Sequence, residues 1–289
     1  MKILRCCKLN LMQWRINPKY PAVFAFLALY LWFQLHGYVN FCQDMGYPVR
    51  PWLFPLLPGT TVAFMPMYLA FVLLISDAPF LNRQQQFVLQ RVGKRTWAAG
   101  QLLYLFLTCV IYTAALWLLS WVFLLPVLEW KDGWGPLLTT VATESLHDGY
   151  RMMALDYGCM QNVTPIAATA WVASVMVGIS FLMGEIMILC NLWLKKGVGA
   201  VVVSAFTLLP LIIQILFYKS SISALLWISP LSWLNRSLMG HTNRNLPSYS
   251  YAVGVTVGLS ALLGVVLIAT IHRLNLETDK SNGVMSREK

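Results

Sequence analysis

The chain has 289 residues, of which 58% are apolar and only 11% charged, and its formal net charge is +10. Soluble domains average about 25% charged residues, so this composition excludes a protein whose surface lies mainly in water. The basic residues flank long apolar runs rather than gathering in one patch, which indicates membrane topology and argues against nucleic-acid binding.

Six apolar runs predict membrane-spanning helices. Each is about as long as, or longer than, the ~20 residues needed to cross about 30 Å of hydrocarbon. The first is long enough to be a retained span rather than a cleaved signal peptide. We therefore predict an all-α integral membrane protein with one transmembrane domain over residues 1–289 and no separate soluble domain. The expected spans are 21–39, 59–76, 96–125, 165–194, 198–218 and 249–271.

The charges between the spans predict the orientation. The N-terminus, the loop after the second span, the Lys195-Lys196 turn and the tail 273–289 hold 15 of the 21 Lys and Arg residues. Basic loops stay on the cytoplasmic side, so both termini are expected in the cytoplasm. The polar loop 128–164 is then expected on the outer face.

Two further segments predict short helices at the membrane surface. Residues 1–20 combine apolar and basic side chains in a pattern typical of an interfacial helix. Residues 219–248 contain an uncharged stretch that is too short to cross the bilayer and is interrupted by Pro230. They are expected to form re-entrant or interfacial helices on the outer side, between the fifth and sixth spans.

The segment 77–95 predicts an amphipathic cytoplasmic helix between the second and third spans. Ser76 or Asp77 is expected to cap its N-terminus, with Pro79 in the first turn. Its apolar residues fall roughly on one face and its basic and amide residues elsewhere, as in a helix that lies along the membrane.

Candidate chemical groups are few. The sequence contains no P-loop, HExxH or GxSxG motif, so we expect no catalytic residue, no metal site and no cofactor on this chain. Glu185 lies deep in the fourth expected span, where a carboxyl group should face protein or water. It is either a polar element of a translocation path or helix lock, or a protonated side chain paired with a neighbouring helix. Asn191 and Gln214 are further polar groups of this kind.

Two of the six cysteines, Cys42 and Cys159, are expected on the outer side. Either they form a disulfide there or they are two unrelated thiols.

Several local motifs resemble the membrane subunits of the ABC-2 type transporter permease family. They are the runs ISDAPF at 75–80, LQRVGKRTW at 89–97 with GQ at 100–101, and SPLSWL at 229–234. The expected six spans, the interfacial helix and the outer short helices match the same family. The outer loop 128–164 departs from it, because family members often keep this loop short.

The resemblance implies the role of the segment 77–95, which would be the coupling helix that sits in a cleft of a separate ATPase subunit. The apolar and polar side chains that contact the ATPase would be those of Asp77, Phe80, Arg83, Phe87, Val88, Arg91, Lys94 and Arg95. Two ATPase chains would carry ATP and Mg, and a second permease chain, identical or paralogous, would complete a dimer. The implied function is export. An apolar path with few charges favours an amphipathic, lipidic or peptidic cargo over small ions, and the small size of the chain with a separate ATPase indicates a bacterial plasma membrane.

Two other interpretations stay open. The first is a non-transporting sensor or immunity subunit that still couples to an ATPase. The second is a membrane-embedded enzyme, with Glu185 and the outer acids as its site. Those acids are Glu129, Asp132, Glu144, Asp148 and Asp156.

Overall fold

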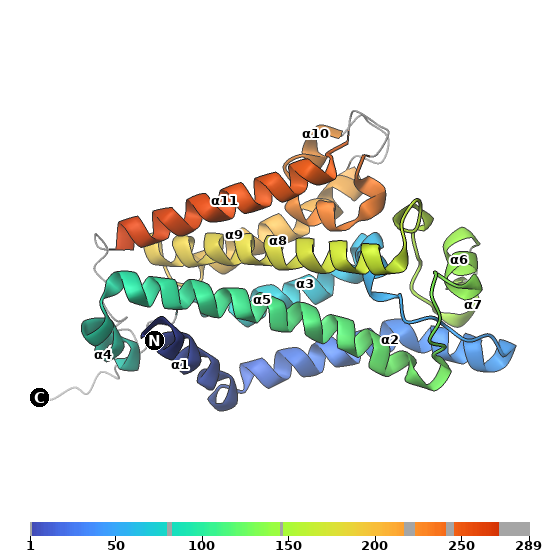
Figure 1. Cartoon of the computed structure of the whole chain (residues 1–289), viewed down its shortest axis with the longest axis horizontal. Helices are drawn as coiled ribbons and strands as arrows, with labels where there is room; N and C mark the ends of the chain where they lie inside the picture. Colours follow the sequence, from blue (N-terminus) through green and yellow to red (C-terminus); the bar gives the residue numbers. More distant parts are fainter. Residues whose placement is uncertain (1, 80–82, 145–146, 217–222, 241–245, 272–289) are drawn as a thin grey trace, which may run out of the picture.

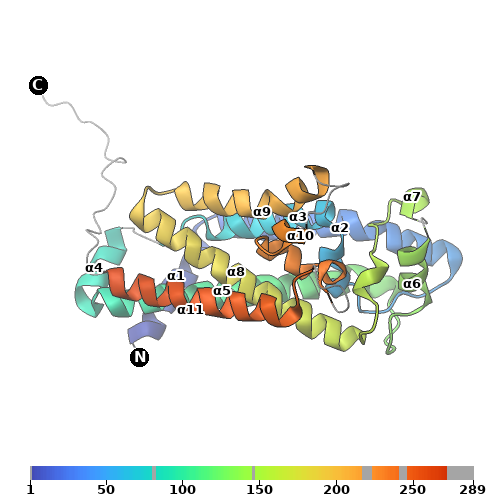
Figure 2. The same cartoon turned by 90° about the horizontal axis from the view of Figure 1, so that it is seen from above.

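A computed structural model gives the fold and describes residues 2–79, 83–144, 147–216, 223–240 and 246–271. In these ranges the chain is helical, and its only strand-like pairing is an isolated bridge between Val49 and Leu128. The helices form an elongated bundle (Figures 1 and 2). The expected tail 273–289 lies outside the described residues.

Five helices in the described part of the chain are long and apolar enough to cross a membrane, which confirms an all-α membrane protein. Their ends lie close to the predicted spans, although the first helix begins two residues earlier and ends six residues later than 21–39. They are α2 (Lys19–Met45), α5 (Lys94–Leu124), α8 (Pro165–Trp193), α9 (Val198–Leu216) and α11 (Tyr249–Thr270).

The predicted second span, 59–76, is shorter than expected. Its helix α3 (Thr61–Ile75) has 15 residues, or about 22 Å at 1.5 Å per residue, less than the ~30 Å of hydrocarbon. The preceding prolines favour a tight 3₁₀ turn, η1 (Phe54–Gly59), and Thr60 is extended, so the α-helix starts only at Thr61. By length, the described residues give five spans rather than six.

Helix α3 nevertheless lies at the centre of the bundle, packed against α2 and α9. Its aromatic side chains Tyr68 and Phe71 are fully buried and contact each other, and Phe71 also contacts Tyr112 of α5. The Tyr112 hydroxyl donates a hydrogen bond to the Met67 carbonyl. Aromatic packing and this hydrogen bond therefore fix α3 against α5.

One end of the bundle is formed by α1 (Lys2–Ile16) and α4 (Arg83–Val92), and we call it the α4 end (Figure 1). Helix α1 crosses α5 at Gly100, where an added Cβ would lie 2.7 Å from the Cβ of Cys6. Burial raises the pKa of the Cys6 and Cys7 thiols here. One face of α1, with Cys6, Cys7 and Asn10, is thus buried in the bundle, while the rest of the helix lies at the surface.

The opposite, far end is capped by the segment expected as a polar loop, 128–164. It contains the short helices α6 (Pro136–Thr143), α7 (His147–Tyr150) and η3 (Tyr157–Cys159). Its backbone packs on α2 and the start of α3: Tyr38 donates to the Met153 carbonyl and Thr60 to the Ala154 carbonyl, each at 2.5 Å. The loop is therefore an ordered cap.

Three further short helices lie at the far end, between α9 and α11, as predicted for this stretch. They are α10 (Ser223–Leu226), η4 (Pro230–Leu234) and η5 (Arg236–Leu238).

The close approach of α8 and α9 gives a test of the packing. A Cβ at Gly199 would lie 2.4 Å from the Met187 carbonyl oxygen, so Gly199→Ala should destabilise the protein by about 1–3 kcal/mol through overpacking. Gly254→Ala is the matched control, because its added Cβ would meet nothing within 4 Å. Thermal unfolding in detergent compares the variants; equal melting temperatures for Gly199→Ala and wild type would contradict this packing.

Candidate functional site

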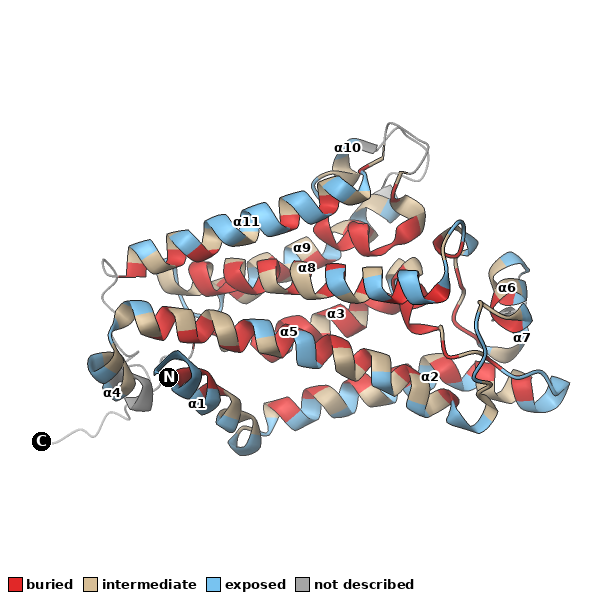
Figure 3. Cartoon of the chain, viewed as in Figure 1, coloured by how far each residue is buried: buried red, intermediate tan, exposed pale blue. Residues whose placement is uncertain are grey.

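Helix α4 follows α3 and precedes α5 in the chain, and it lies at the end of the bundle beside the start of α5 (Figure 1). Phe87 is 67% exposed, and Arg91, one turn further along, is also exposed. Figure 3 shows that α4 carries both exposed and intermediate positions. Val88 and Leu89 instead pack against the core of the bundle. One face of α4 thus anchors the helix, while the other presents an aromatic ring and a positive charge outward.

This geometry corrects the expected coupling helix 77–95. In the described residues the helix begins at Arg83 and ends at Val92. Gly93, with φ +87°, breaks it, because this backbone conformation favours glycine. Lys94 and Arg95 therefore belong to the first turn of α5. Val88 does not face outward as an ATPase contact, since its side chain packs against the core of the bundle.

Two of the expected coupling residues are not described. Phe80 lies outside the described residues, and so does the side chain of Arg83.

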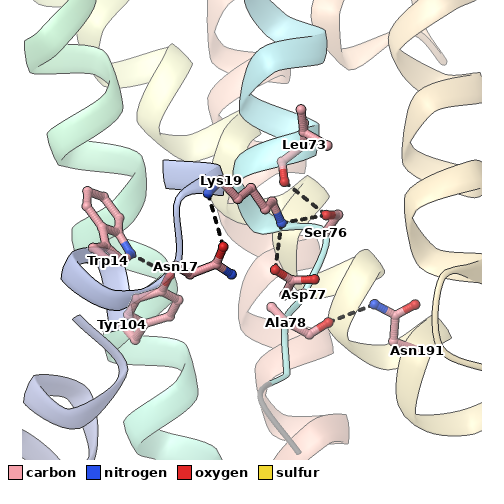
Figure 4. A network of polar contacts seen from close by, with 9 residues as sticks. All are labelled: Trp14, Asn17, Lys19, Leu73, Ser76, Asp77, Ala78, Tyr104 and Asn191. Carbon is pink, nitrogen blue, oxygen red and sulfur yellow. Dashed lines mark hydrogen bonds and ion pairs between the residues drawn. The ribbon is translucent and has the colours of Figure 1, made fainter. Parts of the chain in front are cut away.

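Asp77 does not cap a helix. Its carboxylate pairs with the Lys19 ammonium at 2.8 Å, and the same ammonium donates to the Ser76 hydroxyl at 2.8 Å (Figure 4). The side chains of Lys19 and Asp77 are 19% and 36% exposed, so water and salt weaken the pair only in part. The start of α2 is thereby tied to the chain where it leaves α3.

Asn191, at the end of α8, binds the other side of the same segment. Its amide nitrogen donates to the Ala78 carbonyl at 2.7 Å (Figure 4). Its amide oxygen accepts from the backbone N–H groups of Gly197 and Gly199 at 3.1 and 2.9 Å. A single side chain therefore joins the exit of α3 to the α8–α9 turn, which makes Asn191 a helix lock.

Helix α1 completes this polar network. The Trp14 indole N–H donates to the Tyr104 hydroxyl of α5 at 2.9 Å, and the Trp14 ring stacks on Tyr20 with centroids 5.3 Å apart (Figure 4 shows Trp14 and Tyr104). The residues around the approach to α4 thus come from α1, α2, α3, α5 and α8. Sequence reasoning missed Lys19, Trp14 and Tyr104; their position near span ends resembles that of ordinary interface residues.

A groove of about 460 Å³ opens between α2 and α3, with Lys19 among the residues that line it. The other lining residues are apolar: Ala22, Val23, Phe26, Pro66, Leu69, Ala70 and Leu73.

Glu185 is 1% exposed and lies at the junction of α5, α8 and α11. A Cβ added at Gly264 of α11 would lie 3.2 Å from its carboxyl oxygen, and the neighbouring Gly184 admits Leu105 of α5. One carboxyl oxygen, Oε2, has no hydrogen-bond partner among the described residues. This tightly packed position favours a helix lock over an open path.

The remaining predicted polar residues are separate from one another. Gln214 is exposed on α9. Glu129 pairs with Lys131 at 2.5 Å, and Asp156 accepts from the Gly158 N–H at 2.9 Å, so two of the outer acids have local structural partners. Within the described ranges, no three His, Cys, Asp or Glu side chains lie together as a metal site would require.

Of the two alternatives for Cys42 and Cys159, the structure has the two free thiols. The Cys159 thiol is buried and donates to the Asn235 side-chain oxygen at 3.3 Å. Burial raises its pKa to about 11, which leaves little of the reactive thiolate at neutral pH.

Comparisons with known proteins give no relative: no family model, no curated protein and no solved structure matches the chain.

The Asn191 lock can be tested by substitution. Asn191→Leu would leave the Ala78 carbonyl and two backbone N–H groups without their partner, at a cost of about 1–3 kcal/mol in the free energy of unfolding. Gln214→Leu removes a similar amide from an exposed position and should change stability by less than about 0.5 kcal/mol. Thermal unfolding in detergent measures both; an equal effect of the two changes would argue against the lock.

A thiol count tests the cysteines. After unfolding in detergent without reductant, we expect six free thiols per chain. In the native protein, Cys159 should react with a maleimide far more slowly than after unfolding, since it is buried and mostly protonated. A count of four, with Cys42 and Cys159 both unreactive, would show that the disulfide exists.

Proposed function

We propose that the chain is the membrane subunit of an ATP-driven ABC transporter of the ABC-2 type, and that α4 is its coupling helix. The observation that carries the proposal is α4 itself: a helix anchored on one face, with Phe87 and Arg91 exposed on the other. An exposed aromatic ring beside a charge is typical of a residue that anchors a protein–protein contact.

The connections of α4 support a mechanical role. It is joined to α5 through Gly93 alone, and the chain entering it is held at Asp77 and Ala78 by side chains of α2 and α8. A displacement of α4 by closing ATPase subunits would therefore reach several helices of the bundle together. Rigid elements that shift against one another in this way are a common basis of switching.

The proposed partners and topology follow from this role. The α4 end lies in the cytoplasm with both termini, in agreement with the basic loops, and α3 with η1 forms the sixth span. Two ATPase subunits bind ATP and Mg, and a second permease chain, identical or paralogous, completes the complex in a bacterial plasma membrane. The chain itself performs no catalysis and binds no cofactor.

The cargo that fits best is amphipathic, lipidic or peptidic, and it is exported. The groove between α2 and α3 supports this class, because its lining is apolar except for Lys19 at the α4 end. An apolar tail can occupy such a surface, whereas a small ion would lose its hydration without compensation.

Co-purification tests the proposal. The chain is expressed with its genomic neighbours, and we expect a P-loop ATPase to co-purify with it. Phe87→Asp should weaken that complex about tenfold or more, because loss of a central aromatic anchor costs about 1.4 kcal/mol or more. Mass spectrometry and ATPase activity measure the effect.

The matched control is Leu194→Asp, which puts the same charge at a similarly exposed apolar residue, 64% against 67% exposed. It should keep the ATPase bound. Thermal unfolding checks that neither variant loses its fold. Undiminished ATPase binding and transport by a folded Phe87→Asp variant would refute the coupling role of α4.

A further inference from the structure

An arginine at the far end of the bundle is buried without an acidic partner. Arg236 opens η5 and is 9% exposed. Its guanidinium lies over the Tyr249 ring, 5.1 Å from the centroid. Its Nε–H is buried without a hydrogen-bond partner, and among the described residues the side chain forms no ion pair. A charged group in this position loses hydration without full compensation.

The surroundings hold this arginine in place. The preceding residue, Asn235, accepts hydrogen bonds from the Ser237 N–H at 3.0 Å and from the Ser237 hydroxyl at 2.7 Å. Its amide nitrogen donates to the Gly59 carbonyl at 3.1 Å. Asn235 therefore ties the chain before Arg236 to the end of η1 and also holds the following residue, so the fold fixes the position of Arg236.

The aromatic ring beneath the guanidinium is fixed as well. Tyr249 packs edge-to-face against Trp171 of α8, with centroids 4.6 Å apart. The indole N–H of Trp171 is also buried without an acceptor in the described residues. Two residues that contact the Tyr249 ring, Arg236 and Trp171, thus each carry a buried donor without an acceptor among the described residues.

The nearby carboxylate does not supply this acceptor. Asp156 lies in the cap at the same end, but its side chain accepts from the Gly158 N–H, and it forms no ion pair with Arg236 in the described structure. The described residues therefore supply neither an acceptor for the Arg236 Nε–H nor a carboxylate paired with its guanidinium.

We propose that Arg236 binds a phosphate group, and that Tyr249 supports the guanidinium in this role. A guanidinium matches phosphate through two parallel hydrogen bonds. Tyr249 is the first residue of the membrane-spanning helix α11, and aromatic residues at span ends mark the headgroup level of a bilayer. The phosphate is presented there by a phospholipid headgroup or arrives as a free phosphate. The site is independent of the coupling role of α4.

Native mass spectrometry and thermal unfolding in detergent test the site with three probes: short-chain phosphatidylglycerol, the matching uncharged diacylglycerol, and inorganic phosphate. Wild type should bind phosphatidylglycerol and melt several degrees higher with it. Arg236→Gln should bind it about tenfold or more weakly, since a charge-assisted contact is lost. Arg151→Gln is the matched control, because it removes an exposed arginine at the same end of the bundle, and it should behave as wild type.

The measurements separate the sources of the phosphate. A response to phosphatidylglycerol alone identifies a lipid site, and an equal response to inorganic phosphate identifies a free-anion site.

Without any probe, Arg236→Gln should melt at or above wild type, because an unpaired buried charge has been removed. If the arginine were needed only for packing, the substitution would instead lower the melting temperature. Equal binding by wild type and Arg236→Gln, or stronger binding of diacylglycerol, would overturn the proposal. Should Arg236→Gln fail to fold, Arg236→Lys retains the charge but not the planar fork, and unchanged phosphate binding by that variant overturns it too.

Discussion

The fixed exit of the chain from α3 is the constraint on which the α4 end depends. Three consecutive residues there are held from different helices: Ser76 and Asp77 by Lys19 of α2, and Ala78 by Asn191 of α8. Because Asn191 also binds the first turn of α9, these contacts join four helices at one point. The direction in which the chain leaves toward α4 is therefore set by polar contacts, while the spans themselves are packed mainly through apolar side chains.

The two ends of the bundle are built on different principles. At the α4 end, the Lys19–Asp77 ion pair and the Asn191–Ala78 hydrogen bond connect the ends of α2, α3 and α8. At the far end, the segment between α5 and α8 packs against α2 and η1, and backbone carbonyls of this cap accept hydrogen bonds from Tyr38 and Thr60. Arg236, in η5 at the same end, is the exception, since it is a buried charge whose Nε–H has no acceptor among the described residues.

The comparison of α4 with the predicted segment 77–95 shows why a surface helix is difficult to delimit. Amphipathic periodicity identified the helix, but it could not say that Lys19 would take Asp77 away from the N-cap position. The pattern also could not show that Phe87 is exposed while Val88 packs against the core. Neighbours in sequence lie about 100° apart on a helix, and the packing partner decides which of the two is covered. The ABC-2 resemblance gave the segment a proposed role, but its position and exposure come from the fold.

The sequence by itself determined that the protein is an all-α membrane protein and where its five long spans lie, because an apolar run of about 20 residues has few alternatives to a membrane helix. It also indicated Glu185 as a group that avoids lipid. Only the tertiary structure decided that α3 is short but central, that Cys42 and Cys159 stay apart as free thiols, and that Lys19, Asp77 and Asn191 meet around one turn. These outcomes depend on contacts between residues up to 113 positions apart, and such contacts leave no periodic signal in a single sequence.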